Sequence, residues 1–427
     1  MLWQIVNIVE IPFGKRILRR GMKGKAVRRL QEILTEHGFY SEAVDGQFGV
    51  LTEEAVMLLQ KTFRLTVDGV VGPGVYQTLQ RMNNKVGRII YTVKKGESLA
   101  NISQRFTVAP AAWRRMPDGR GDLKSIYPGM KLWLYRKAFF IWEEKMGANP
   151  ATGNFTGVIN SRLQIDSEAE IDFEPDQIEP DQYHLVQSAA EVWEKCFTSK
   201  KYCQKVAGSF KKLSNYRWGL DLRTAPFDSY PNWNGLFKLL LRHNGMKKMP
   251  LVLVPLFVSE KGVNRGFWDS LADIGDYARL IMIEPVLENT SADAFNAAVQ
   301  QLEKLWSRFS RAGVVRQLLL VVAPQGWNWD EADNFRRVSF KEVKLIRAMH
   351  PRVSEQVLPG KLRMINYMSQ GKSQRLIYRD HQAWQELLVR VIKANFSGIV
   401  IRDFGELGTM GSELIAGSFA VLPEELL

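Results

Sequence analysis

The sequence has 427 residues, of which 45% are hydrophobic and 24% charged, and this balance excludes a disordered, collagen-like or disulfide-stapled chain. No apolar run approaches the roughly 18 residues of a membrane-spanning helix, and the first ten residues lack the basic start of a secretory signal. The net charge of +13 is concentrated at one end, because residues 1–137 hold 23 Lys and Arg against 11 Asp and Glu, whereas the rest hold 35 against 34. The basic third is therefore expected to meet a polyanion, which charge alone does not identify.

Asp-Gly turns occur twice in the basic third, at Asp45-Gly46 and Asp68-Gly69, within similar segments that lie 23 residues apart. Each is followed three residues later by a glycine, Gly49 or Gly72, for which positive φ is expected. Apolar residues at helical spacing lie before and between the turns, which predicts a small three-helix module. These residues are Val27, Leu30, Ile33, Leu34, Ala55, Leu58, Leu59 and Phe63.

Residues 17–81, which follow an N-terminal segment of residues 1–16, resemble the peptidoglycan-binding module type 1. The resemblance rests on both turns and on residues 18–31 and 52–56, which flank them. Modules of this type bind cell-wall glycopeptide, and the resemblance implies the same ligand here.

A second small module is predicted over residues 90–135. Tyr91 and Val93 alternate as on a strand, Gly96 makes a turn, and Ser98 is placed to cap a helix over 99–106. A short helix at 109–115 and a closing strand at 131–134 complete an α+β order of strand, helix, helix and strand. These residues resemble a LysM domain, although Met116 stands where the family usually carries Asn.

LysM domains bind glycans that contain N-acetylglucosamine, such as peptidoglycan and chitin, in a groove between two loops. The resemblance places in that groove Gly96, Glu97, Ser98, Leu99, Pro117, Asp118 and Gly119. The alternative is that Gly96 serves only its turn and Leu99 only the core.

Short apolar runs alternate with helical segments from residue 138 to the end of the chain. The runs cover 138–142, 158–165, 183–186, 218–222, 250–258, 280–284, 317–322 and 398–401. The helices are expected at 188–213, 233–241, 267–271, 292–312 and 381–394. Eight strand–helix units in about 290 residues predict an α/β TIM (β/α)8 barrel over 138–427, with functional groups at the C-terminal ends of its strands.

Several of these strands resemble the spore-germination, or cortex-lytic, branch of glycoside hydrolase family 18, notably residues 219–222, 250–255, 276–282 and 325–329. Enzymes of this family cleave β-1,4 bonds next to N-acetylated sugars. Their fourth strand carries Asp-Gly-x-Asp-x-Asp-x-Glu, in which the last Glu protonates the leaving oxygen and the substrate acetamido group is the nucleophile.

The corresponding strand here keeps Gly219 and Asp221 but has Arg223 for the stabilising acid and Ala225 for the proton donor. Alanine has no proton to give, and general acid catalysis is commonly worth roughly 10²–10⁴-fold. The sixth strand ends in Glu284 instead of the family's Tyr-Asp, and the eighth has Arg402 instead of Trp. The barrel has therefore lost its site or rebuilt it.

Relocated carboxylates are one interpretation of these departures, with Asp221, Glu284 and Asp403 as candidate catalytic residues and Glu406 near them. The other is that Arg223 and Arg402 pair with these acids in a structural ion-pair cluster. Two tryptophans, Trp327 and Trp329, are candidates for stacking on a sugar and equally for the core. Tyr367 is assigned to a hairpin inserted between strands seven and eight.

The favoured function is a peptidoglycan-binding protein of the cell wall or spore whose glycosidase-like barrel is inactive. The alternative is a cortex-lytic N-acetylglucosaminidase. Five scattered histidines give no metal-ligand spacing, and no cofactor motif occurs, so neither a metal nor a cofactor is expected. The partners expected are peptidoglycan or a chitin-like glycan and spore-layer proteins, with no nucleic acid and no membrane span.

Cys196 and Cys203 are expected on one helix, about two turns apart and too distant for a disulfide. They are interpreted as reduced thiols of a chain that is made in the cytosol without a signal peptide and is located at the spore coat or cortex surface.

Overall fold

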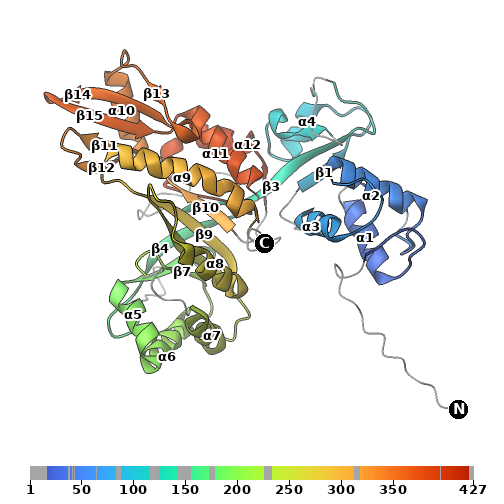
Figure 1. The fold of residues 1–427 in the computed structure, drawn as a ribbon, viewed down its shortest axis with the longest axis horizontal. Helices are drawn as coiled ribbons and strands as arrows, with labels where there is room; N and C mark the ends of the chain where they lie inside the picture. Colours follow the sequence, from blue (N-terminus) through green and yellow to red (C-terminus); the bar gives the residue numbers. More distant parts are fainter. Residues whose placement is uncertain are drawn as a thin grey trace. The chain divides into compact units, whose positions relative to one another are not determined.

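The computed structural model describes residues 17–36, 39–40, 42, 44–63, 65–82, 88–115, 123, 125–142, 155–172, 178–225, 233–311, 318–394 and 396–422. The chain divides into two compact units, Met1–Arg136 and Lys137–Leu427, and each is described separately (Figure 1). No helix within the described ranges is long and apolar enough to span a bilayer.

Three helices open the first unit, as predicted: α1 (Lys25–Glu36), α2 (Val50–Thr62) and α3 (Pro73–Met82). Six of the eight expected apolar residues are buried in their core, and Phe63 packs against it partly buried. Leu58 is exposed, and Val56 is buried in its place. Helix α2 carries apolar residues on more than one face, so the helical spacing of apolar residues did not identify correctly which of them are buried.

Two matching turns hold the helices together, and each is fixed by a buried glutamine. The Gln31 side chain accepts a hydrogen bond from the Gly46 amide at 2.7 Å and donates to Asp45 Oδ1 at 2.8 Å. Gln60 repeats this arrangement on the turn at Asp68, to whose Oδ1 it donates at 2.6 Å. Positive φ occurs at the glycine inside each turn and not at Gly49, where φ is −87°.

The rest of the first unit follows the predicted order of strand, helix, short helix and strand. The order is β1 (Arg88–Thr92), α4 (Leu99–Arg105), the 3-10 helix η1 (Pro110–Ala112), β2 (Arg114–Arg115) and β3 (Lys131–Trp142). Strand β1 pairs antiparallel with β3 from Arg88 opposite Tyr135 to Thr92 opposite Lys131, and the short β2 adds to the other edge. The residues of Met116 and of the predicted groove at Pro117, Asp118 and Gly119 lie outside the described ranges.

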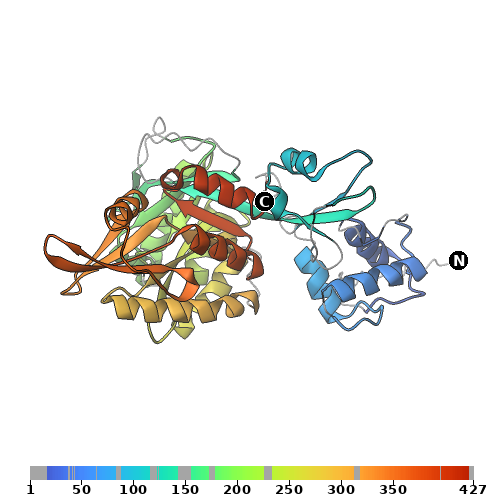
Figure 2. The ribbon, with the colours of Figure 1, turned by 90° about the horizontal axis from the view of Figure 1, so that it is seen from above.

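Eight parallel strands close the barrel of the second unit, and every strand expected from the sequence is present (Figure 2). In chain order they are residues 138–142 of β3, then β4 (Gly157–Ile165), β6 (Tyr183–Ser188), β7 (Arg217–Asp221), β8 (Met249–Val258), β9 (Ala278–Leu287), β10 (Leu318–Val322) and β16 (Gly398–Arg402). Closure comes from β3, which pairs in parallel with both β16 and β4.

Alternate residues of the strands fill the barrel interior, among them Phe140, Leu253, Met282 and Val400. Strands β3 and β16 approach so closely that a Cβ at Gly398 would collide with the Ala138 carbonyl. Only glycine fits there.

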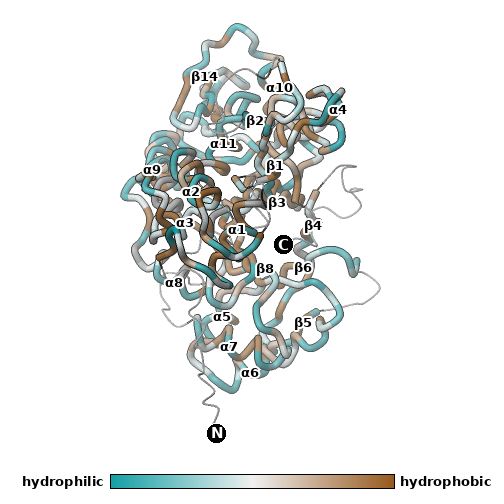
Figure 3. The backbone as a smooth tube through the Cα atoms, turned by 90° about the vertical axis from the view of Figure 1, so that its right-hand side faces the viewer, coloured by the Kyte–Doolittle hydropathy of each residue, from teal (hydrophilic) through white to brown (hydrophobic). Residues whose placement is uncertain are grey.

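Amphipathic helices cover the outside of the barrel, and hydrophobic and hydrophilic residues alternate along them (Figure 3). They are α5 (Ala190–Thr198), α6 (Lys200–Ser209), η3 (Phe210–Leu213), α7 (Trp233–His243), α8 (Arg265–Tyr277), α9 (Ala292–Arg311), α11 (His381–Lys393), η6 (Phe404–Leu407) and α12 (Thr409–Ala416). Two short strands extend the sheet: β5 (Ile171–Asp172) pairs with β4, and β17 (Ala420–Val421) pairs with β3.

The single helix predicted over 188–213 is wrong, because the chain breaks at Ser199, whose hydroxyl caps α6 by accepting from the Tyr202 amide. Cys196 and Cys203 consequently lie on successive helices instead of two turns apart on one helix. Both are buried free thiols, and the thiol of Cys203 is hydrogen-bonded with that of Cys196.

A five-stranded antiparallel sheet is inserted between β10 and β16 (Figure 1). It contains β11 (Gln325–Asp330), β12 (Phe335–Ser339), β13 (Gln356–Val357), β14 (Arg363–Ser369) and β15 (Lys372–Tyr378), with α10 (Phe340–Met349) and η5 (Pro359–Lys361) in the connections. Tyr367 lies on β14 in the β14–β15 hairpin, as predicted. We refer to this sheet as the insertion sheet.

Candidate functional site

Charged side chains gather where the strands of the barrel end. Asp221 and Arg402 are the last residues of β7 and β16, Glu284 lies near the end of β9, and Arg223 lies two residues beyond the end of β7. Because the strands are parallel, these ends share one face, where barrel enzymes place their functional groups.

The four side chains form one ion-pair network. The Arg223 guanidinium donates to both oxygens of Asp221, with Nη2–Oδ2 at 2.7 Å and Nε–Oδ1 at 3.1 Å. Its Nη1 also lies 3.6 Å from Glu284 Oε2, while Glu284 Oε1 accepts from Arg402 Nη2. The network therefore runs Asp221–Arg223–Glu284–Arg402, with two positive and two negative charges.

Trp142, the fully buried last residue of β3, supports both cations of the network. The guanidinium carbon of Arg223 lies 4.9 Å from the centroid of its ring, and that of Arg402 lies 5.2 Å away. An indole ring attracts a cation within about 6 Å, so Trp142 holds the two arginines over the barrel mouth.

The network is the structural ion-pair cluster that the sequence offered as one of two interpretations. Both carboxylates of the network accept hydrogen bonds from arginine N–H groups. Ala225 is buried in the turn after β7 and contributes no titratable group. Position 225, at which the sequence resemblance would place a proton donor, is thus apolar in this chain.

The other two acids near the mouth have separate positions. Asp403 follows β16 in the left-handed conformation, with φ +51°, and its amide donates to the Trp142 carbonyl at 2.7 Å. Glu406 Oε2 accepts from the Phe340 amide at 2.8 Å, at the start of α10, so this carboxylate fixes the insertion to the barrel. Arg223 joins Asp221 and Glu284, two of the three acids expected at the mouth.

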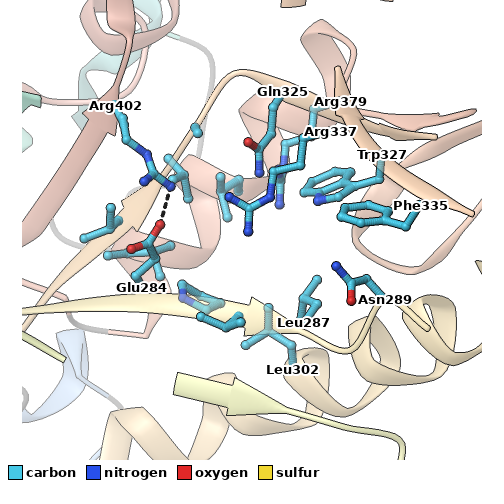
Figure 4. Close-up of a pocket in the computed structure, with 17 residues that line it drawn as sticks. Glu284, Leu287, Asn289, Leu302, Gln325, Trp327, Phe335, Arg337, Arg379 and Arg402 are labelled. Carbon is cyan, nitrogen blue, oxygen red and sulfur yellow. Dashed lines mark hydrogen bonds and ion pairs between the residues drawn. The ribbon is translucent and has the colours of Figure 1, made fainter. Parts of the chain in front are cut away.

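A pocket extends from the network toward the insertion sheet (Figure 4). Glu284 and Arg402 line one end, and residues of the insertion sheet line the other. The polar and aromatic residues of that second end are Asn289, Gln325, Trp327, Phe335, Arg337 and Arg379. Between the two ends the wall is apolar and includes Leu287, Leu302 and Leu320.

The two tryptophans proposed for sugar stacking have different environments. Trp327 is 8% exposed and lines the pocket, with the Arg379 guanidinium over its ring at 5.1 Å. Trp329 is 1% exposed, packs against Phe295 and Phe335, and donates through Nε1 to the Asn289 carbonyl. Trp329 therefore packs in the core, which is the alternative that the sequence left open for it, and stacking of a sugar on Trp327 stays a prediction.

The described part of the expected LysM groove is held by internal hydrogen bonds. The Glu97 carboxylate accepts from the Tyr91 hydroxyl at 2.6 Å and from the Lys94 amide at 2.9 Å, and it pairs with Arg105. The Tyr91 hydrogen bond is the main reason that the pKa of Glu97 falls to about 2. Ser98 caps α4 through the Asn101 amide, and Gly96 has φ +83°, whereas Leu99 is partly exposed. Glycan contact by these residues stays a prediction.

Three comparisons with known proteins agree with this architecture. Residues 23–79 match the PG_binding_1 family of peptidoglycan binding domains. Over 72 residues, 17% of this chain and 22% of the relative, the chain is 38% identical to a spore cortex-lytic enzyme of Halalkalibacterium halodurans. Over 67 residues, 16% of this chain and 26% of the relative, it is 40% identical to a spore cortex-lytic enzyme of Bacillus cereus. The chain thus spans about a quarter of the length of these relatives.

Solved structures share the fold. The Bacillus megaterium spore cortex-lytic enzyme SleL superposes with a TM-score of 0.50 at 12% identity, covering 78% of this chain and 87% of that one. A chitinase of Chromobacterium violaceum gives 0.50 at 13% identity, covering 66% and 98%. The chain therefore carries a peptidoglycan-binding domain and a barrel with the fold of chitinases and of SleL.

Several residues of the site were missed by sequence reasoning. Arg337, Arg379 and Asn289 line the pocket but were given no role from the sequence, and Gln325 was noted only as part of residues 325–329. The four residues come from segments up to 90 residues apart. The one feature of the sequence that could have indicated this part of the pocket is Arg379, a cation directly after the apolar end of a strand.

Proposed function

We propose that this protein binds peptidoglycan and that its barrel does not act as a glycosidase. The observation that carries the proposal is the Asp221–Arg223–Glu284–Arg402 network, which stands with Ala225 where the related enzymes place a carboxylate pair and a proton donor. The match of residues 23–79 supports the binding role.

Residues 90–135 are proposed as a LysM domain that adds a second glycan-binding module. The strand–helix–helix–strand order and the β1–β3 pairing support this assignment. We further propose that the protein is located on spores, since the relatives matched by its first module include two spore cortex-lytic enzymes. Detection of the tagged protein only in vegetative cytosol, with none on spores, would refute this location.

The experiment that tests binding and activity together is incubation of the full chain with purified cortex and vegetative peptidoglycan. The pellet is assayed for protein, and the supernatant is analysed for muropeptides by mass spectrometry. Protein in the pellet without released fragments is the expected result. Failure to pellet would contradict the binding role.

A glycosidase with relocated carboxylates is the second candidate, and one observation favours it. Glu284 Oε2 lines the pocket and makes no hydrogen bond with the described residues, although it faces Arg223 at 3.6 Å. If Glu284 were the acid, new reducing-end N-acetylglucosamine fragments would appear and would vanish in Glu284→Gln. Glu288→Gln is the matched control, because Glu288 directly follows β9 and does not line the pocket.

A further inference from the structure

Two cations of the pocket have no anionic partner among the residues that the structure describes. Three arginines and one glutamate line it, and the glutamate, Glu284, is already paired with Arg402. Within the described part of the chain, the side chains of Arg337 and Arg379 make no hydrogen bond and no ion pair. In Figure 4 both of these side chains extend from the insertion sheet into the pocket, near Gln325. The pocket therefore carries uncompensated positive charge.

Arg379 is the more constrained of the two. Its guanidinium lies against two indole rings, with the guanidinium carbon 5.1 Å from the centroid of Trp327 and 5.7 Å from that of Trp384. Burial lowers the pKa of Arg379 to about 10, since desolvation disfavours its charged form.

The nearest acid along the chain is not available to it. Asp380 accepts from Arg363 Nε at 2.7 Å and caps α11 through the Ala383 amide at 2.8 Å. Arg379 is thus a desolvated cation whose sequence neighbour is committed to another arginine.

Arg379 is partly buried and Arg337 is exposed, so the cost of desolvation falls on Arg379, and an anion bound beside its guanidinium would offset that cost. A guanidinium presents a planar fork of N–H donors that matches a carboxylate in bidentate geometry. The amides of Gln325 and Asn289 add neutral donors to the same wall. The chemistry of the pocket is therefore suited to a polar ligand with a carboxylate.

We infer that the pocket formed by Arg337, Arg379, Gln325 and Trp327 binds a carboxylate of the cell-wall glycopeptide. This inference rests on the proposed function, which supplies the polymer. Two groups of that polymer carry the required chemistry: the lactyl carboxylate of a muramic acid without peptide, and the free carboxylate of a stem peptide. The barrel would then recognise the acidic part of the wall, whereas an uncharged chitin-like glycan lacks the recognised group.

Isothermal titration of the full chain with four soluble probes tests the inference. N-acetylmuramic acid carries the lactyl carboxylate, and its methyl ester lacks it. Muramyl dipeptide has an amidated lactyl group and one free peptide carboxylate, and chitobiose has no carboxylate. We expect one or both of the carboxylate probes to bind and the ester and chitobiose to bind at least about tenfold more weakly, as for the loss of a charge-assisted hydrogen bond.

Arg379→Gln and Arg337→Gln are each expected to weaken the binding of the carboxylate probe at least about tenfold. Arg352→Gln is the matched control, because Arg352 is exposed and does not line the pocket. Binding of N-acetylmuramic acid alone assigns the lactyl group, and binding of muramyl dipeptide alone assigns the stem peptide. Equal binding of chitobiose, or binding that neither arginine variant weakens, would overturn the inference.

A stability measurement separates this role from a structural one. If Arg379 is held for a ligand, Arg379→Met keeps the packing volume, removes the desolvated charge and leaves the melting temperature of the free protein undiminished. A structural arginine would instead give a clear fall. Pelleting with intact peptidoglycan is measured in the same variants, because it reports the proposed function independently. If the protein pellets but its probe binding does not depend on the arginines, only the inference about the pocket is refuted. If probe binding depends on the arginines but the protein does not pellet, only the wall-binding role is refuted.

Discussion

Arg223 reaches from the end of β7 past the neighbouring strand β8 to Glu284 on β9, where its Nη1 lies 3.6 Å from Oε2. The same guanidinium binds Asp221 through two nitrogens. One side chain therefore links two acids that the barrel would otherwise leave repelling each other at its mouth.

Removal of one charged side chain from this network should lower the free energy of unfolding more than removal of both members of an ion pair. Arg402→Met leaves Glu284 buried with only its longer contact to Arg223, and we expect the unfolding free energy of the barrel to fall by about 2–3 kcal/mol. Glu284→Gln in the same background should recover most of this loss, because the unpaired charge is then absent. The measurement is urea unfolding with Arg352→Met as control, and equal losses in the single and double variants would contradict the network.

The buried glutamines should stabilise their own turns. Gln31→Leu removes the acceptor of the Gly46 amide and the donor to Asp45, and we expect the helical module to lose about 2–3 kcal/mol. Hydrogen exchange at Gly46 should accelerate, whereas exchange at Gly69, held by Gln60, should change less. Gln47→Leu is the control, since the Gln47 side chain is exposed. Equal acceleration in both turns would indicate global unfolding instead.

Acid should weaken the loop at Glu97. The pKa of this carboxyl is lowered from 4.5 to about 2, so its contribution to stability is complete above about pH 4.5 and is lost as the pH falls toward 2. Glu97→Gln should melt at a lower temperature than the natural protein at pH 6, and the difference should shrink toward pH 2. Glu54→Gln, at an exposed helical position, is the control. A difference that stays constant with pH would contradict the assignment.

Gly398 should tolerate no side chain. A Cβ there would collide with the Ala138 carbonyl, which belongs to the paired strand and cannot move without breaking the barrel. Gly398→Ala should destabilise the barrel by roughly 3 kcal/mol or more. Gly405→Ala provides the comparison, because nothing lies within 4 Å of its Cβ position. Similar melting temperatures for the two variants would be inconsistent with this packing.

The barrel strands were predictable because parallel strands are buried on both faces and appear as short apolar runs. The helix over 188–213 was mispredicted, because nothing in the hydrophobic pattern marks the break at Ser199, which depends on a capping hydroxyl. The insertion sheet was anticipated only as a hairpin at Tyr367.

The residues of the site could be predicted where they alternate along one barrel strand. They could not be predicted where they come from the insertion sheet. Asp221 and Arg223 are two residues apart, and their contact follows from that spacing. Trp327 and Trp329 are also two apart on β11, yet only Trp327 lines the pocket, because Phe295 and Phe335 pack around Trp329. Arg337 and Arg379 meet the barrel mouth only through tertiary folding, which no local pattern records.

The pairing of β3 with β16 has a consequence for the order in which the chain folds. Ala138 can pair with Gly398 only after the chain has been synthesised as far as residue 398, and the Leu422 amide then donates to the Lys137 carbonyl. The helical module at the other end completes its contacts within about 60 residues, so it should be folded on the ribosome while the barrel is still open. A chain released before residue 398 would expose the edges of β3 and β10 together, and such unpaired edges make a polypeptide prone to aggregate.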